Sequence, residues 1–103
     1  MINKHININS TGIKNFCIKH HIIKLAFFGS LLRDDFDNTS DIDVLVIFEN
    51  GYVPGFFGLF EMQDELSILL EGRKVDLCTP QDLSRYFRDD VLNTMEVEYE
   101  ARR

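Results

Sequence analysis

Two stretches of the chain place apolar residues at the three- and four-residue spacing of an amphipathic helix. The first follows a cap at Ser10 or Thr11 and runs to about residue 20, with one apolar stripe. The second covers residues 56–71, and Gly72 follows it where a left-handed C-terminal cap is expected. Each stripe predicts a helix that packs one face against a sheet.

A third helix is predicted from its start signal. Thr79 is a suitable N-cap, Pro80 suits the first helical position, and the carboxylate of Asp82 can bond back to the cap. We expect this helix to continue from Thr79 to about Asn93.

Four shorter runs rich in apolar residues predict strands. They span residues 22–28, 41–49, 74–78 and 95–100. The first two are apolar on both faces, which predicts central strands. The last run puts Met95, Val97 and Tyr99 on one side and glutamates on the other, which predicts an edge strand, with a continuing helix as the alternative.

This order of elements predicts an α+β fold in which helices cover a small β-sheet, and it leaves open whether the sheet is parallel or mixed. Of the 103 residues, 45% are hydrophobic and 27% charged, so residues 1–103 are expected to form a single domain. No apolar run suggests a membrane span or a signal peptide. Cys17 and Cys78 lack metal-binding or disulfide spacing, which favours a reducing, cytoplasmic setting.

Charge is divided unevenly along the chain. The net charge is -6, and all 17 acidic residues lie after residue 28, whereas the segment before it contains lysines and no acidic residue. An acidic chain is repelled by the phosphate backbone, so direct binding of nucleic acid is not expected.

Candidate metal ligands stand at the start of the second predicted strand. Asp41 and Asp43 are two residues apart, so in a strand both carboxylates point to one face, with Cα atoms about 6.6 Å apart. Two carboxylates this close repel each other unless a cation lies between them. Pairs of divalent ions about 3.5 to 4 Å apart serve phosphoryl and nucleotidyl transfer, and carboxylates favour Mg²⁺ or Mn²⁺.

Two further features would complete such a site. Asp76 interrupts the apolar third strand, where a charge is costly without a ligand or a partner. Gly29 and Ser30 end the first strand, where glycine lets a phosphate approach the backbone and the hydroxyl can bind it. If the strands are neighbours, the aspartates and the phosphate-binding turn come together.

These residues resemble a motif of the nucleotidyltransferase superfamily that includes DNA polymerase beta and kanamycin nucleotidyltransferase. The pattern is Gly29-Ser30, then ten residues, then Asp41-x-Asp43, and later a strand aspartate, Asp76. Its parts are independent of one another, so their combination is more specific than an isolated Asp-x-Asp.

Within this superfamily the chain is similar to the minimal nucleotidyltransferases, the antitoxins encoded beside HEPN-domain ribonuclease toxins. The similarity rests on the small size, Arg33, the strand SDIDVLV and the closing segment VDLCTPQDLSRYFRDDVL, and it covers about residues 10–100. It implies a nucleotidyltransferase fold with a mixed sheet. It also implies Mg²⁺-dependent transfer of AMP from ATP to a tyrosine hydroxyl of the toxin, which silences the toxin, and a complex between the two proteins.

The resemblance assigns a role to each candidate. The expected catalytic and metal-binding residues are Asp41, Asp43 and Asp76. The expected ATP-binding residues are Gly29, Ser30 and Arg33. The family usually has small residues on both sides of the position of Arg33, whereas this chain has Leu32 and Asp34, so its nucleotide preference stays open.

Other interpretations remain open beside this one. A nucleotidyltransferase could act on a small hydroxylated molecule such as an antibiotic, and an antitoxin could neutralise by binding alone. A calcium loop in the acidic segment would need Gly and Glu at positions where this chain does not supply both.

Several other residues have a structural interpretation. Phe56, Phe57 and Phe60 are expected to be buried, with a docking face as the alternative. His20 and His21 are expected to form a partly exposed turn. Cys78 is expected to pack rather than to react.

Overall fold

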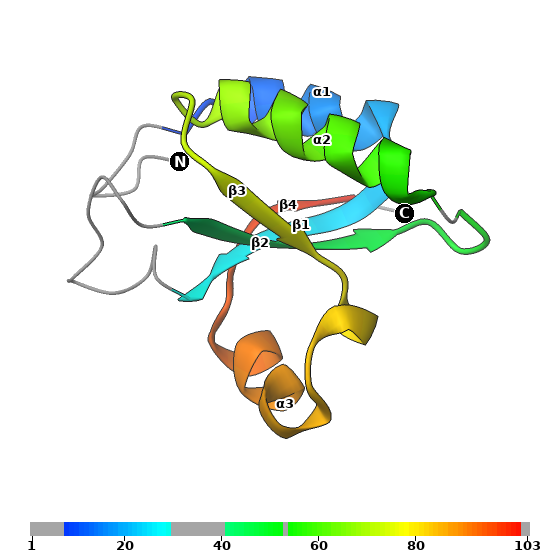
Figure 1. The fold of residues 1–103 in the computed structure, drawn as a ribbon, viewed down its shortest axis with the longest axis vertical. Coiled ribbons are helices and arrows are strands. Elements are labelled where there is room, and N and C mark those ends of the chain that lie inside the picture. The colour runs from blue at the N-terminus through cyan, green and yellow to red at the C-terminus, as the bar shows by residue number, and fades with distance from the viewer. Residues whose placement is uncertain (1–7, 30–40, 53, 102–103) are drawn as a thin grey trace.

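The structure is a computed structural model, and it describes residues 8–29, 41–52 and 54–101 (Figure 1). Helices and strands follow one another along these residues. They are α1 (Ser10–Lys19), β1 (Ile22–Phe28), β2 (Ile42–Phe48), α2 (Phe56–Leu69), β3 (Val75–Cys78), η2 (Pro80–Asp82), α3 (Arg85–Thr94) and β4 (Glu96–Glu100). None of the helices in these ranges is long and apolar enough to cross a membrane.

The strands form one mixed sheet in the order β3-β2-β1-β4. β1 pairs antiparallel with both β2 and β4, whereas β2 pairs parallel with β3. The expected mixed sheet is therefore confirmed, β1 and β2 are central, and the tail forms an edge strand.

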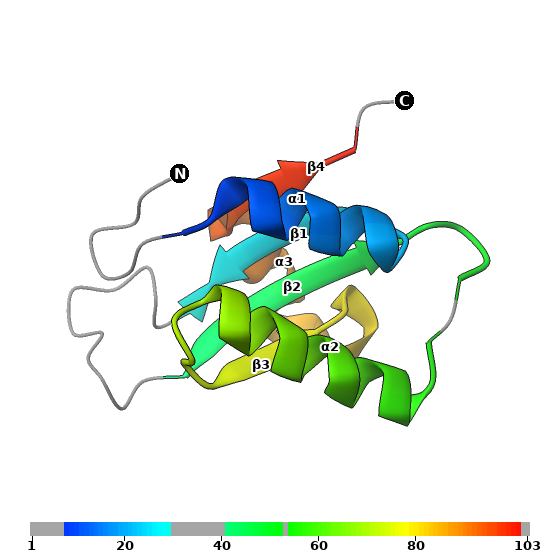
Figure 2. The ribbon, with the colours of Figure 1, turned by 90° about the horizontal axis from the view of Figure 1, so that it is seen from above.

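Helices cover both faces of this sheet. α1 and α2 lie side by side on one face, and η2 and α3 lie on the other (Figures 1 and 2). Because successive strand residues point to opposite faces, Val44 and Val46 pack under α1 and α2, whereas Leu45 packs towards α3 with Leu83 and Val91. The parity of the strand thus assigns Asp43, two residues before Leu45, to the face of α3.

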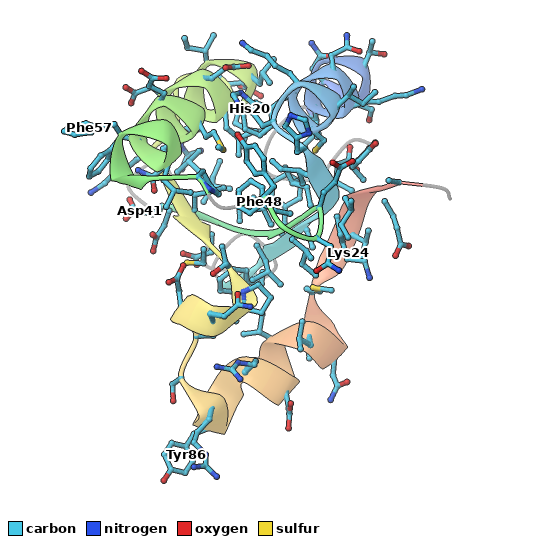
Figure 3. All side chains as sticks on the ribbon, turned by 90° about the vertical axis from the view of Figure 1, so that its right-hand side faces the viewer. His20, Lys24, Asp41, Phe48, Phe57 and Tyr86 are labelled. Atoms are coloured by element: carbon cyan, nitrogen blue, oxygen red, sulfur yellow. The ribbon has the colours of Figure 1, made fainter. Side chains whose placement is uncertain are left out.

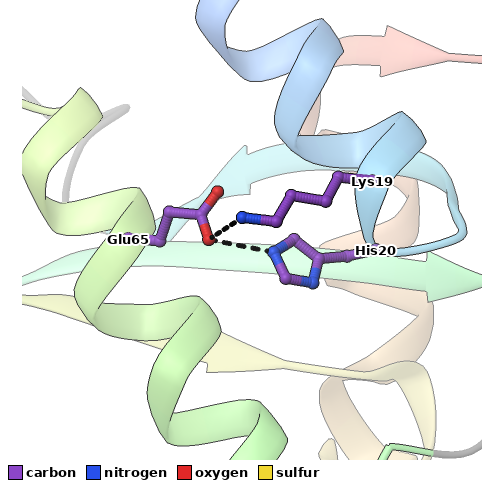
Figure 4. A network of polar contacts seen from close by, with 3 residues as sticks. All are labelled: Lys19, His20 and Glu65. Carbon is purple, nitrogen blue, oxygen red and sulfur yellow. Dashed lines mark hydrogen bonds and ion pairs between the residues drawn. The ribbon is translucent and has the colours of Figure 1, made fainter.

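A small polar network joins α1 to α2 (Figure 4). One carboxylate oxygen of Glu65, Oε1, lies 3.2 Å from the Lys19 ammonium and 3.1 Å from Nε2 of His20. Burial opposes ionisation of Glu65, but the hydrogen bonds to His20 and Lys19 outweigh it and lower the pKa of the carboxyl from its ordinary value. His20 is half-buried and its neighbour His21 is exposed, so the turn after α1 is as expected.

The ends of α1 and α2 lie close to the predicted positions. Gly72 is left-handed as predicted, with φ of +77°, but α2 already ends at Leu69 and Glu71 before the glycine is left-handed as well, with φ of +64°. The cap of α1 is Asn9 rather than Ser10 or Thr11, because the Asn9 side chain accepts a hydrogen bond from the backbone N–H of Gly12 at 2.9 Å.

The prediction of one helix from Thr79 to Asn93 was wrong. The predicted capping box forms between Thr79 and Asp82, but it starts only the short helix η2. Leu83 then adopts an extended conformation, with φ of −83° and ψ of 141°, and Ser84 caps a new helix, α3. The break lets the buried side chain of Leu83 reach the second core beneath the sheet.

The predicted alternation of the last strand was also wrong. A register shift between Leu25 and Ala26 interrupts the pairing of β1 with β4. As a result Met95 packs on the α3 side of the sheet, whereas Tyr99 packs on the side of α1 and α2. A bulge moves the side chains beyond it to the opposite face of the sheet, and the types of residue in the strand do not predict it.

Candidate active site

Asp43 and Asp76 face each other across the parallel pair of strands. Residues 43 and 76 are register partners on β2 and β3, and neighbouring strands lie about 4.8 Å apart. Both residues share the parity of Leu45 and Cys78, which contribute to the core on the α3 side. Asp43 is half-buried and Asp76 is exposed, so a polar ligand can reach the pair.

Asp41 lies just before β2, at the rim of this arrangement. Its side chain is about half exposed, and Oδ2 lies 3.9 Å from the Lys74 ammonium. Among the residues that the structure describes, no three His, Cys, Asp or Glu side chains converge closely enough to hold a metal ion. The tertiary structure therefore brings Asp43 and Asp76 together and leaves Asp41 beside them, paired with Lys74.

The end of β1 supplies the third part of the site. Phe28 is the register partner of Asp43, and Gly29 follows it with φ of +69°, a region that L side chains rarely adopt. A Cβ atom at Gly29 would collide with Oδ2 of Asp43. Glycine is thus required here both by the backbone and by its carboxylate neighbour. Ser30 and Arg33 lie outside the described residues.

A cavity of about 690 Å³ opens in front of these residues, between the sheet and α3. Phe28 and Leu83 are among its apolar lining residues, and Asp43 and Asp76 belong to the sheet wall. The opposite wall is α3, which contributes Asp90 and Thr94. The sequence analysis gave Asp90 and Thr94 no role, although the family-like closing segment runs into α3, because these residues meet the sheet only through the fold. The described lining has four aspartates and no basic side chain.

Cys78 lines the same cavity but is poorly suited to act as a nucleophile. Burial, helped by the nearby negative charges of Asp76, Asp82 and Asp43, raises the pKa of its thiol to about 11. At neutral pH the group is a protonated thiol that packs against the second core. The expectation that Cys78 packs is confirmed.

Carboxylate oxygens on adjacent strands are the donors that hard divalent cations prefer. The two that the sheet brings together, Asp43 and Asp76, suit Mg²⁺ in chemistry, and a bound ion would take further oxygen ligands from a neighbouring group or a phosphate. The glycine beside them has no side chain, and the Asp43 carboxylate occupies the place that a Cβ atom would take.

The mixed sheet with helices on both faces is the fold of a nucleotidyltransferase. Residues 11–103 match the family described as polymerase beta, nucleotidyltransferase, and the chain belongs to that family. The family resemblance of the motif is therefore confirmed, and the chain is identified as an enzyme of the nucleotidyltransferase class.

Individual relatives agree with this assignment. The chain is 34% identical, over 85% of its length and 94% of the relative's, to "Putative protein adenylyltransferase MJ0435" of Methanocaldococcus jannaschii. A protein solved as a "putative minimal nucleotidyltransferase" shares 28% identity over 85% of each chain, with a TM-score of 0.67. A crystal structure of a toxin-antitoxin with AMP-PNP has a TM-score of 0.72 at 18% identity and covers 92% of this chain and 76% of that one, which supports the fold.

Proposed function

We propose that this chain transfers AMP from ATP to a tyrosine hydroxyl of a HEPN-domain ribonuclease toxin and thereby silences the toxin. The observation that carries the proposal is the pair Asp43 and Asp76, set in register at the mouth of an open cavity beside Gly29. Similarity to a relative named as a protein adenylyltransferase supports a protein acceptor. Similarity in fold to a toxin-antitoxin crystallised with AMP-PNP supports the partner and the nucleotide.

In this proposal Asp43 and Asp76 bind Mg²⁺ together, with Asp41 as the further ligand at the rim. Two bound Mg²⁺ ions would neutralise the charge on the phosphates and on the attacking oxygen. Asp41 can contribute only when its carboxylate turns from Lys74, which lies 3.9 Å away and is itself largely exposed. An exposed ion pair of this kind contributes at most about 1 kcal/mol, so phosphate binding nearby can displace it.

The remaining candidate residues bind the nucleotide. Gly29 gives the phosphates access to the end of β1, and Ser30 and Arg33 are proposed to hold the triphosphate through a hydroxyl and a guanidinium. Asp76, which is exposed to the cavity, accepts the proton of the incoming hydroxyl. The oxygen of that hydroxyl then bonds to the α-phosphorus of ATP, the bond from this phosphorus to the bridging oxygen breaks, and pyrophosphate leaves.

A protein acceptor suits the shape of the cavity. Its described walls are the sheet on one side and α3 on the other, so a large part of the acceptor must be held by groups from outside these residues. Holding reactants in register is a large part of what such an enzyme contributes. A docked protein can supply that alignment through its own structure, whereas a small molecule would depend on the walls alone.

Intact-mass spectrometry of the chain incubated with its cognate toxin, ATP and Mg²⁺ tests the proposal. We expect the toxin to gain mass in whole AMP units and to lose ribonuclease activity. The Asp76→Asn variant should not modify the toxin, whereas the control Asp89→Asn, which changes an exposed carboxylate on α3 outside the cavity lining, should behave as the wild type.

The same experiment separates the two alternatives. An unshifted toxin whose ribonuclease is nevertheless inhibited would establish neutralisation by binding alone. Consumption of ATP with a small hydroxylated acceptor, and none with the toxin, would establish the small-molecule activity.

A further inference from the structure

The outer face of α2 carries apolar side chains that no described residue covers. Phe57, Phe60 and Ile68 are 85%, 58% and 78% exposed, so the expected burial of the aromatic cluster is wrong for two of its members. Figure 3 shows Phe57 on the side of α2 that faces away from the sheet. Glu61 and Asp64 are exposed on the same helix face, since residues three, four and seven apart are neighbours.

The outer face of α1 has the opposite charge. Ile18 is 58% exposed, and Lys14, one turn earlier, is exposed as well. α1 contains two lysines and no acidic residue, whereas α2 contains acidic residues and no basic one. Each helix therefore presents an apolar group with charges of a single sign, positive on α1 and negative on α2.

These charges are not used within the described part of the chain. Lys14, Glu61 and Asp64 form no ion pair there, whereas Lys19 and Glu65, which face each other across the two helices, are paired at 3.2 Å. The charged side chains between α1 and α2 are thus paired within the chain. Those on the outer faces of the two helices remain available to a partner.

The arrangement of α1 and α2 makes their combined outer surface complementary in charge to a second copy of itself. α1 and α2 lie side by side and run in opposite directions on one face of the sheet (Figure 2). A two-fold axis that runs along the layer between them would place α1 of one copy over α2 of the other, and the same contact would occur twice. At both contacts a basic helix would meet an acidic one, with apolar side chains between them.

We propose that two copies of this chain form a symmetric dimer through the outer faces of α1 and α2. The dimer would bury Phe57, Phe60, Ile68 and Ile18, and would pair Lys14 of each copy with Glu61 or Asp64 of the other. Charge complementarity favours a second copy as the occupant, because the chain holds both halves of the match. The cavity beneath α3 lies on the opposite face of the sheet and stays open in the dimer.

Sedimentation velocity on the purified chain tests this proposal. The wild type at about 50 μM should sediment with about twice the monomer mass of 12.0 kDa. Phe57→Ser combined with Ile68→Ser should yield a monomer, and both positions are exposed, so the monomer itself keeps its core. The matched control is Tyr86→Ser, which removes an aromatic that is 91% exposed on α3, on the other face of the sheet, and it should stay dimeric.

A charge reversal provides the sharper measurement. Lys14→Glu alone, or Glu61→Lys with Asp64→Lys, should raise the dimer dissociation constant about tenfold or more, because like charges then oppose each other. The triple variant restores opposite charges and should recover the dimer, which a non-specific apolar association would not do. A wild type that stays monomeric would overturn the proposal, as would a dimer that the reversals leave unchanged. If Phe57→Ser instead weakened only the complex with a toxin, the face would belong to that partner.

Discussion

The absent side chain of Gly29 makes room for the carboxylate of Asp43. Gly29 ends β1 in a left-handed conformation, and a Cβ atom built there would collide with Oδ2 of Asp43, which belongs to β2. The relationship joins the phosphate-binding candidate to the metal-binding candidate through direct steric contact. It explains physically why a glycine precedes the serine of the motif.

Gly29→Ala should therefore impair both folding and transfer. The left-handed backbone alone makes an alanine unfavourable by about 1–2 kcal/mol, and displacement of the Asp43 carboxylate should add to this loss and abolish nucleotide transfer. Gly51→Ala is the matched control, since Gly51 has φ of +85° but no atom within 4 Å of its added Cβ. Thermal denaturation should show both variants destabilised, Gly29→Ala more than Gly51→Ala, and only Gly29→Ala should lose activity. Equal activity in the two would contradict the steric link.

Asp76→Asn should change how the protein responds to its ligands. Removing one of two opposed carboxylates relieves about 0.2–1 kcal/mol of repulsion, so in metal-free buffer the midpoint of thermal unfolding should rise by roughly 1–6 °C. Addition of Mg²⁺ and ATP should stabilise the wild type strongly and the variant little, because ligand binding to the folded state raises its stability. Asp89→Asn, exposed on α3 and outside the cavity lining, serves as control. Equal stabilisation of all three proteins would remove Asp76 from the metal site.

The contact between α1 and α2 should depend on pH through Glu65. Its lowered pKa means that the ionised form stabilises the fold; this contribution is complete above the ordinary value of 4.5 and is lost as pH falls through the lowered pKa. Because Glu65 is about a third exposed, solvent screening limits the effect, and Glu65→Gln should lose about 0.2–1 kcal/mol at pH 7. Urea titrations at pH 7 and pH 3 measure it, with Asp89→Asn, exposed on α3, as control. A deficit of equal size at both pH values would indicate a packing effect instead.

The buried thiol of Cys17 should make the fold sensitive to alkali. Burial raises the pKa of Cys17 from 9.0 to about 12, so the unfolded chain loses this proton at lower pH than the folded one. The contribution of the thiol is complete below pH 9 and is lost as pH rises towards 12. Between these values the free energy of unfolding should fall less steeply for Cys17→Ala than for the wild type, measured by urea titration at several pH values. Parallel slopes for the two proteins would contradict the assignment.

The local sequence pattern predicted secondary structure correctly wherever a stretch of the chain carried the signals of only one type of element. β1 and α2 could be predicted without information from elsewhere in the chain. The spacing of their apolar residues and the glycines that follow them were sufficient. The stretch after Thr79 departed from the pattern. Its predicted capping box forms, but the helix ends before Leu83. That side chain is buried against a sheet formed by distant residues, and this burial outweighed the local preference for a continuous helix.

The candidate site divides in the same way. The Asp-x-Asp motif and Asp76 were recognisable as candidate metal ligands, because a charged residue in an apolar strand is costly without a ligand or a partner. The wall formed by Asp90 and Thr94 was not, since these are ordinary residues of a polar helix until the fold sets them opposite the sheet.

By itself the sequence determined where most helices and strands form, which aspartates are candidate metal ligands and which family the chain resembles. These properties depend on residues close together in the chain, or on a motif that few other arrangements produce. Tertiary structure alone decided the partners of each residue: Asp43 beside Asp76, Asp41 beside Lys74, and Phe57 left exposed. Strand register, a bulge in the edge strand and the position of α3 are consequences of packing between distant segments, and that packing has no local pattern by which it could be predicted.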